Sequence, residues 1–358
     1  MIAFERQGYG HTADIADRPF SFERSAGDTA ALVREHKPNR LLFHKLSKVL
    51  FALTITPLLS QTGTGWHKYQ DNPIIGGQYG TVFDVFVLKE GPTYRMWASW
   101  RPKHSLALFE SEDGIHWSEP QIVLAPNNAT DWEADINRPA VVKRADGYHL
   151  WYTGQWYASQ ADGHSCIGYA TSADGKVWKR MSPKPVLVPD QQWEKVAVMC
   201  PHVIWDERVK LFRMWYSGGE QFEPNAIGYA TSPDGFQWTK DTSNPVFRPV
   251  PEHVWEQERV TAPQVFRRGP WYYMFYIGFR DIEHAQIGMA RSRDGITNWE
   301  RYPGNPIVRP GQGTWDEDAC YKPFAIFDGK KWLLWFNGRR GNLEQIGLAL
   351  HEGEDLGF

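Results

Sequence analysis

Short segments in which apolar and polar residues alternate recur along most of the chain, and tight-turn residues separate them. The segments LFRMWYSG, from Leu211, and WYYMFYIG, from Trp271, are two examples. A period of two is typical of β-strands that present two different faces. Asp-Gly pairs follow several of these segments, and such pairs favour the positive φ angles of a tight hairpin. The pattern therefore predicts an all-β protein built from hairpins.

The strand segments belong to a repeated unit of about 60 residues. Each clear copy has a Trp-acid pair, an inner strand that contains a proline, two further strands, an Asp-Gly turn and a fourth strand that starts at a tryptophan. The Trp-acid pairs are Trp132-Glu133, Trp193-Glu194, Trp255-Glu256 and Trp315-Asp316. A less faithful copy occupies residues 79–124. We therefore expect five four-stranded units.

One four-stranded sheet cannot bury both of its faces alone, and radial packing of five such sheets gives a five-bladed β-propeller. The fifth copy stops after its third strand, whereas residues 65–75 match the fourth strands of the other copies. We predict that this N-terminal strand completes the last blade and closes the ring, which leaves no open edge there. The predicted propeller spans residues 65–358, and residues 1–64 form an N-terminal extension.

Composition and charge narrow the classes of function. The net charge of −3 gives no sign of a nucleic-acid partner. The sequence contains no run of 18 apolar residues, so we expect no membrane span. Residues 45–63 combine lysines, an apolar run and small polar residues, as a signal peptide does, but they begin far from Met1. Two interpretations stay open: a packed appendage of a cytoplasmic protein, or a targeting segment of a secreted or periplasmic one.

The three cysteines, Cys166, Cys200 and Cys320, lie far apart in the sequence. Their spacing matches no zinc motif, and the odd number argues against a full disulfide framework. We expect buried free thiols. The sequence requires no cofactor and predicts no metal ligands, although a structural cation in the central channel stays open as an alternative.

The repeat also separates structural residues from candidate functional ones. A polar residue that all copies share is expected to serve the fold, as Glu133 and Asp234 do, whereas a polar residue in one copy only is free to do chemistry. The connections that follow the second strands differ in length and sequence, and variable loops on one face of a rigid scaffold usually build the site. We therefore place the site at the channel mouth beside these loops.

The Asp-Gly-x-x-Trp turns and Asn-Pro-Ile linkers resemble those of the five-bladed β-propeller glycosidases, the group of glycoside hydrolase families 43, 32 and 130. Those enzymes carry an acid on the first inner strand, an aspartate before proline in a middle blade and a glutamate near the start of a later inner strand. Asp84, in VFDVFV, matches the first, and Glu258, in WEQERVTAP, is the candidate for the last. Cys200 occupies the middle slot, and Asp135 is the candidate to replace that aspartate.

The resemblance implies a carbohydrate-active enzyme that hydrolyses a glycosidic bond in an oligo- or polysaccharide. We expect inversion, with Asp84 as base, Glu258 as acid and Asp135 as a tuning or sugar-binding group. The separation of the two carboxyl groups, ~5 Å in retaining enzymes or ~6.5–9.5 Å in inverting ones, sets the stereochemical outcome. Two alternatives stay open. One is a glycoside phosphorylase or transferase on the same fold, and the other is a non-catalytic propeller that binds glycans.

Polar, basic and aromatic residues that break the repeat are the candidates for substrate binding. The basic ones either pair with nearby acids or hold an anion such as a uronate, a sulfate or a phosphate, and the second interpretation predicts an anionic glycan. Trp156 is a candidate stacking platform for a sugar. The candidates are Asn137, Arg138, Trp156, His202, Glu220, Arg259, Arg280, Asp318, Tyr321, Lys322 and Arg339.

Overall fold

A computed structural model describes residues 65–156 and 163–358, and β-strands make up nearly all of their regular structure. The described residues also contain short 3₁₀ helices, η1 (Gly77–Tyr79), η2 (Arg101–Lys103), η3 (Gln192–Glu194) and η4 (Val254–Glu256). The all-β prediction is confirmed. The predicted N-terminal extension, with its segment 45–63, lies outside the described residues.

Antiparallel pairing groups the strands into sets of four, and a single parallel bridge links the second set to the third. The first set holds β2 (Val82–Glu90), β3 (Thr93–Trp100), β4 (Ser105–Ser111) and β5 (Gln121–Leu124). The second holds β6 (Asp135–Arg144), β7 (Gly147–Trp156), β8 (His164–Ser172) and β9 (Lys179–Arg180). The third holds β10 (Ala197–Asp206), β11 (Leu211–Gly219), β12 (Pro224–Ser232) and β13 (Thr239–Lys240). The fourth holds β14 (Arg259–Arg268), β15 (Trp271–Asp281), β16 (His284–Ser292) and β17 (Glu300–Arg301). The fifth holds β18 (Ala319–Phe327), β19 (Lys331–Arg340), β20 (Leu343–Glu352) and β1 (Trp66–Lys68).

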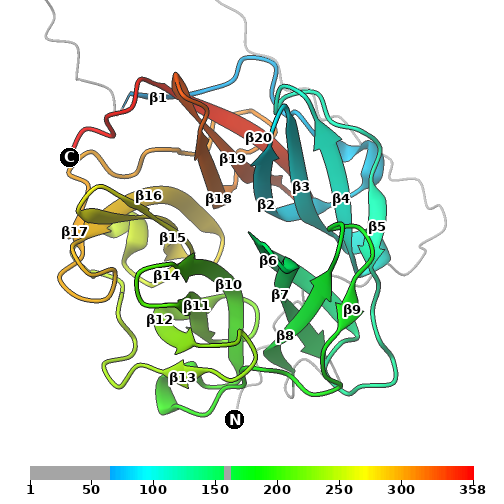
Figure 1. The fold of residues 1–358 in the computed structure, drawn as a ribbon. Coiled ribbons are helices and arrows are strands. Elements are labelled where there is room, and N and C mark those ends of the chain that lie inside the picture. The colour runs from blue at the N-terminus through cyan, green and yellow to red at the C-terminus, as the bar shows by residue number, and fades with distance from the viewer. Residues whose placement is uncertain (1–64, 157–162) are drawn as a thin grey trace, which may run out of the picture. The chain divides into compact units, whose positions relative to one another are not determined.

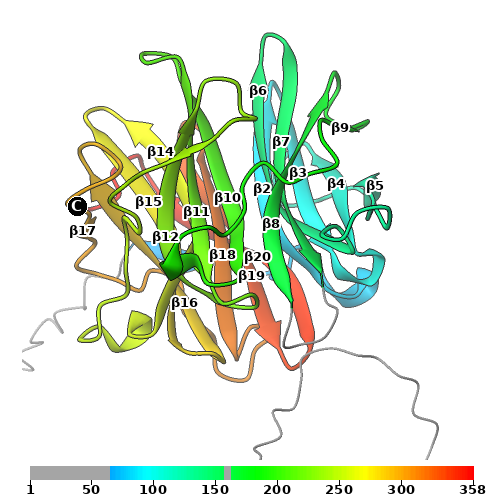
Figure 2. The ribbon, with the colours of Figure 1, turned by 90° about the horizontal axis from the view of Figure 1, so that it is seen from below.

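The sets lie around a common centre, with β2, β6, β10, β14 and β18 innermost (Figure 1). Seen from below, these inner strands run side by side along the direction of the channel (Figure 2). Strand β1 pairs antiparallel with β20, with Trp66 opposite His351. The predicted closure of the last set by an N-terminal strand is therefore confirmed.

The acid of each Trp-acid pair holds the outer strand of its own set. Glu194 is fully buried, accepts a hydrogen bond from Tyr216 Oη at 2.7 Å and pairs with Lys240 Nζ of β13 at 2.6 Å. Lys68 of β1 makes the corresponding ion pair with Asp316. A buried carboxylate needs such a partner, because an unpaired buried charge is strongly destabilising. These acids serve the fold, as the repeat predicts.

The Asp-Gly turns join neighbouring sets. Trp151 Nε1 donates a hydrogen bond to the carbonyl oxygen of Gly235, in the next set, at 2.8 Å. Asp234 Oδ1 accepts the backbone N–H groups of Phe236 and Gln237 and so stabilises its own turn. The same tryptophan-to-glycine hydrogen bond recurs from Trp97 to Gly175, from Trp215 to Gly295 and from Trp335 to Gly114.

Replacing Gly235 with alanine is expected to lower the free energy of unfolding by about 2–4 kcal/mol. The new Cβ would lie 2.7 Å from Trp151 Cζ2, at a φ of +76° that disfavours side chains. Gly269→Ala is the matched control, since Gly269 has a φ of +55° but no atom within 4 Å of a Cβ, and it should lose only about 1 kcal/mol. Chemical denaturation measures both values, and equal losses would contradict the role of the Gly235 contact.

Candidate active site

Each inner strand carries a β-bulge at the equivalent position of its set, and the first residue of each bulge has a positive φ. These five residues line one small cavity with a volume of about 40 Å³, to which all five inner strands contribute. Proline follows the bulged residue in every inner strand except β2, where Val85 stands. The bulged residues are Asp84, Arg138, Cys200, Ala262 and Lys322.

Side chains from the neighbouring set hold these strained bulges in place. Ser99 Oγ accepts the backbone N–H of Arg138 at 2.9 Å, and Thr153 Oγ1 accepts that of Cys200 at 3.2 Å. Ser217 and Asn337 do the same for Ala262 and Asp84. A positive φ costs a residue other than glycine about 1–3 kcal/mol, so these contacts fix which side chains face the cavity.

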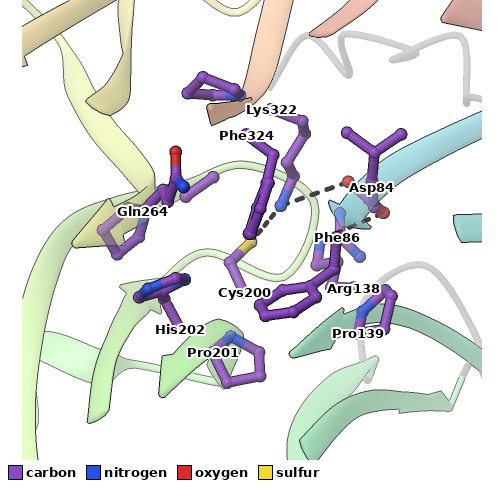
Figure 3. A pocket seen from close by; sticks show the side chains of 14 residues that line it. Asp84, Phe86, Arg138, Pro139, Cys200, Pro201, His202, Gln264, Lys322 and Phe324 are labelled. Atoms are coloured by element: carbon purple, nitrogen blue, oxygen red, sulfur yellow. Dashed lines mark hydrogen bonds and ion pairs between the residues drawn. The ribbon is translucent and has the colours of Figure 1, made fainter. Parts of the chain in front are cut away.

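Asp84 is the one carboxylate among the residues that line this cavity (Figure 3). Its side chain is buried, and Ser99 Oγ donates a hydrogen bond to Oδ2 at 3.2 Å. Lys322 Nζ lies 3.3 Å from Oδ1, and Arg138 Nε lies 3.9 Å from Oδ2. Two cations therefore lie beside the Asp84 carboxyl group in the cavity lining.

Arg138 is positioned by two amides. Its Nη1 donates to Asn137 Oδ1 at 2.6 Å and to Gln155 Oε1 at 3.3 Å. Asn137 Nδ2 in turn donates to Gln155 Oε1 at 2.6 Å. Asn137, a predicted binding residue, thus acts through Arg138, and Gln155 joins the site without having been predicted.

Glu223, which was not among the predicted residues, lies outside the cavity lining but interacts electrostatically with two of its cations, Arg138 and Lys322. It stands just before β12, is half-buried, and its backbone carbonyl accepts a hydrogen bond from Arg259 Nη1. Removal from water raises the pKa of its carboxyl group to about 7, and nearby Arg138 and Lys322 only partly oppose this rise. The sequence offered one signal for Glu223, because it stands directly before a proline in a variable loop. Glu220, in the same loop, was chosen as the candidate instead.

A second group of charges lies beside Tyr321. Tyr321 Oη donates a hydrogen bond to Glu344, whose other oxygen lies 3.2 Å from Arg101 Nη2. Burial and the charge of Glu344 raise the pKa of Tyr321 well above its usual value. Glu344 also contributes to the raised pKa of Glu223. Tyr321 is a predicted binding residue, whereas Arg101 and Glu344 were not predicted.

The structure does not bring the other predicted carboxylates to the cavity lining. Glu258 is exposed, and its backbone N–H donates to the carbonyl of Phe279. Asp135 lies 3.5 Å from His104 Nδ1, and its hydrogen bond raises the pKa of that histidine. Asp318 Oδ2 accepts the backbone N–H of Gly341 at 2.7 Å. Roles for Glu258 and Asp135 in catalysis stay predictions.

Most of the remaining candidates make local contacts. His202 lines the cavity, and its Nε2–H donates a hydrogen bond to the Val265 carbonyl oxygen at 2.8 Å. Burial lowers the pKa of His202 to about 4. Trp156 packs beside His164, with ring centroids 5.4 Å apart. Three candidates form ion pairs: Glu220 with Lys195, Arg280 with Asp281, and Arg339 with Glu283.

Within residues 65–156 and 163–358, no three His, Cys, Asp or Glu side chains gather as a metal site. A structural cation in the channel stays a prediction. In the same residues, no helix has the length and apolar character to cross a membrane.

Other proteins resemble this chain in sequence, and several solved structures resemble it in fold. The uncharacterized protein Rv1502 of Mycobacterium tuberculosis is 29% identical over 237 residues, which cover 62% of this chain and 72% of that protein. The beta-1,2-mannobiose phosphorylase of Thermoanaerobacter sp. is 30% identical over 145 residues, which cover 36% of this chain and 45% of that enzyme. A solved glycoside hydrolase has a TM-score of 0.64 at 19% identity and covers 77% of this chain and 88% of its own.

The family model of glycosyl hydrolases family 43 matches residues 70–347, which include every inner strand and all five bulged residues of the cavity. The predicted resemblance to this group is confirmed. The chain belongs to glycosyl hydrolases family 43, and it is a carbohydrate-active enzyme on an all-β propeller fold.

Proposed function

We propose that the enzyme hydrolyses a glycosidic bond, with Glu223 as the general acid and Asp84 as the general base. The observation that carries this assignment is the raised pKa of Glu223 near Arg138 and Lys322, the same two cations that lie beside Asp84. Two carboxyl groups whose surroundings separate their protonation states are suited to the acid and base roles of one reaction.

The proton transfers follow from these surroundings. With a pKa of about 7, Glu223 still carries its proton in a large fraction of molecules at neutral pH and can give it to the leaving oxygen. Asp84, held by Ser99 and two cations, accepts a proton from the attacking water. This chemistry uses two side chains and water, and it requires no cofactor.

Attack of water on the face opposite the leaving group inverts the anomeric centre. Proton NMR of the first product formed reads the anomer directly. Inversion supports Asp84 as a base, whereas retention would make the carboxylate a nucleophile and would overturn the proposed role.

The basic residues favour phosphorolysis as a second candidate function. Arg138, Lys322 and Arg259 all act on Glu223 electrostatically, and two of them line the cavity with Asp84. Such a group of cations suits a phosphate ion, which would attack the sugar without needing a base. The similarity to a beta-1,2-mannobiose phosphorylase also supports this candidate.

Dependence on phosphate separates the two functions. The full chain is assayed on a panel of oligosaccharides and aryl glycosides, with and without inorganic phosphate, and products are identified by mass spectrometry. We expect free reducing sugar and an unchanged rate without phosphate. A sugar phosphate that forms only with phosphate present would establish phosphorolysis. Saturable binding of glycans without any turnover across the panel would instead support the glycan-binding alternative.

A further inference from the structure

Cys200 and Lys322 bring a thiol and an amine together in the cavity, and the proposed proton transfers use neither group. Their side chains extend from the bulges of β10 and β18, and Lys322 Nζ lies 2.5 Å from Cys200 Sγ (Figure 3). This separation is shorter than an ordinary hydrogen bond to sulfur and longer than a covalent sulfur–nitrogen bond. It matches the spacing that one bridging oxygen atom leaves between the two.

The surroundings of the pair suit oxidation. Cysteines beside lysine or arginine and open to small molecules are the ones that oxidise selectively in proteins. All three cysteines are buried, but Cys200 lines the cavity, whereas Cys166 and Cys320 lie outside its lining. Asp84 Oδ1 is buried without a hydrogen-bond partner and lies 3.3 Å from Lys322 Nζ. It is therefore placed to take a proton from the amine.

We propose that Cys200 and Lys322 form a modification site at which dioxygen links them through a covalent N–O–S bridge. The Sγ–H bond and one Nζ–H bond break, the Sγ–O and O–Nζ bonds form, and the second oxygen atom leaves as water. Sulfur and nitrogen each lose two electrons, and dioxygen accepts all four. Two equivalents of a dithiol reverse the reaction and return the thiol, the amine and one water.

The bridge would change the site in two ways. It would join β10 to β18 across the channel, and it would remove the positive charge of Lys322 beside Asp84. We therefore expect lower turnover in the oxidised enzyme and recovery on reduction. This consequence rests on the proposed function, because it takes Asp84 as the base, but formation of the bridge does not.

Intact mass and peptide mapping test the bridge without any assay of activity. The full chain is held in air-saturated buffer or reduced under nitrogen, and then unfolded and analysed. After air exposure we expect a gain of one oxygen atom less two hydrogen atoms, a linked peptide containing Cys200 and Lys322, and loss of one of three titratable thiols. Dithiothreitol should restore the original mass.

Matched variants decide which residues carry the change. Cys166→Ser should still show the mass change, whereas Cys200→Ser and Lys322→Arg should not, with circular dichroism confirming that each variant is folded. The proposal is overturned if Cys200 gains only two or three oxygen atoms without a link, or if the change persists in folded Lys322→Arg. It is equally overturned if air-exposed wild-type protein keeps three alkylatable thiols.

Discussion

Replacing Glu223 with glutamine is expected to lower kcat/KM by about 10²–10⁴-fold, the usual contribution of a general acid. Glutamine keeps the size and polarity of the side chain but cannot give a proton to the leaving oxygen. The measurement is steady-state kinetics on the first glycoside found to be turned over. A glycoside with an activated aryl leaving group needs less protonation, so the loss should be smaller on that substrate.

The pH profile gives an independent test of the same role. Because burial raises the pKa of Glu223 to about 7, the acid is protonated below that pH and loses its proton above it. The kcat/KM of the wild-type enzyme should therefore fall as pH rises through about 7, and Glu223→Gln should lack this alkaline limb. Glu207→Gln, an exposed residue paired with Lys210, is the control and should keep it. An unchanged limb in Glu223→Gln would assign it to another group.

Replacing Asp84 with asparagine is the second change with a large expected effect, a loss of about 10²–10⁴-fold in kcat. The amide cannot take a proton from water, although it can still accept the hydrogen bond from Ser99. Azide needs no base to attack the sugar, so added azide should restore part of the rate and yield a glycosyl azide. Kinetics and mass spectrometry of the product measure both effects.

The control and the stability of this variant exclude a loss of fold. Asp71→Asn changes an exposed acid outside the cavity lining and should leave kcat unchanged. Asp84→Asn also leaves Lys322 without its carboxylate, so thermal unfolding is measured in parallel. Rescue by azide requires a folded site. A variant that raises KM but keeps kcat would show that Asp84 binds substrate and is not the base.

The sequence predicted the fold well because each structural feature depends on residues close together in the chain. The alternation of apolar and polar residues and the Asp-Gly turns each involve neighbouring residues, and the repeat shows the same pattern in several copies. Even the closure of the ring was predictable, because Trp66 stands at the start of a segment that completes the repeat missing after β20. The position of Asp84 on an inner strand was predictable for the same reason, because the repeat marks the position and the other copies have no acid there.

The surroundings of the other candidate carboxyl groups could not be read from the repeat. Glu258 was chosen because it lies near the start of an inner strand, although its distance from the proline departs from the family pattern, and the path of its loop leaves it exposed. Glu223 has no repeat to mark it, and its altered pKa arises from burial beside residues of other sets. The distance between residues in the sequence predicts neither the path of a loop nor how far a carboxyl group is removed from water.

By itself, then, the sequence determined the repeated strands, the closing N-terminal strand, the structural acids and the inner-strand position of Asp84. Only the tertiary structure decided that Asp84, Arg138, Cys200 and Lys322 meet at one cavity, that Glu223 shares its cations, and that a thiol lies beside an amine. The physical reason is that alternation of apolar and polar residues, together with the turn residues, specifies each strand locally. These side chains, in contrast, come together only when sets distant in sequence pack around the channel.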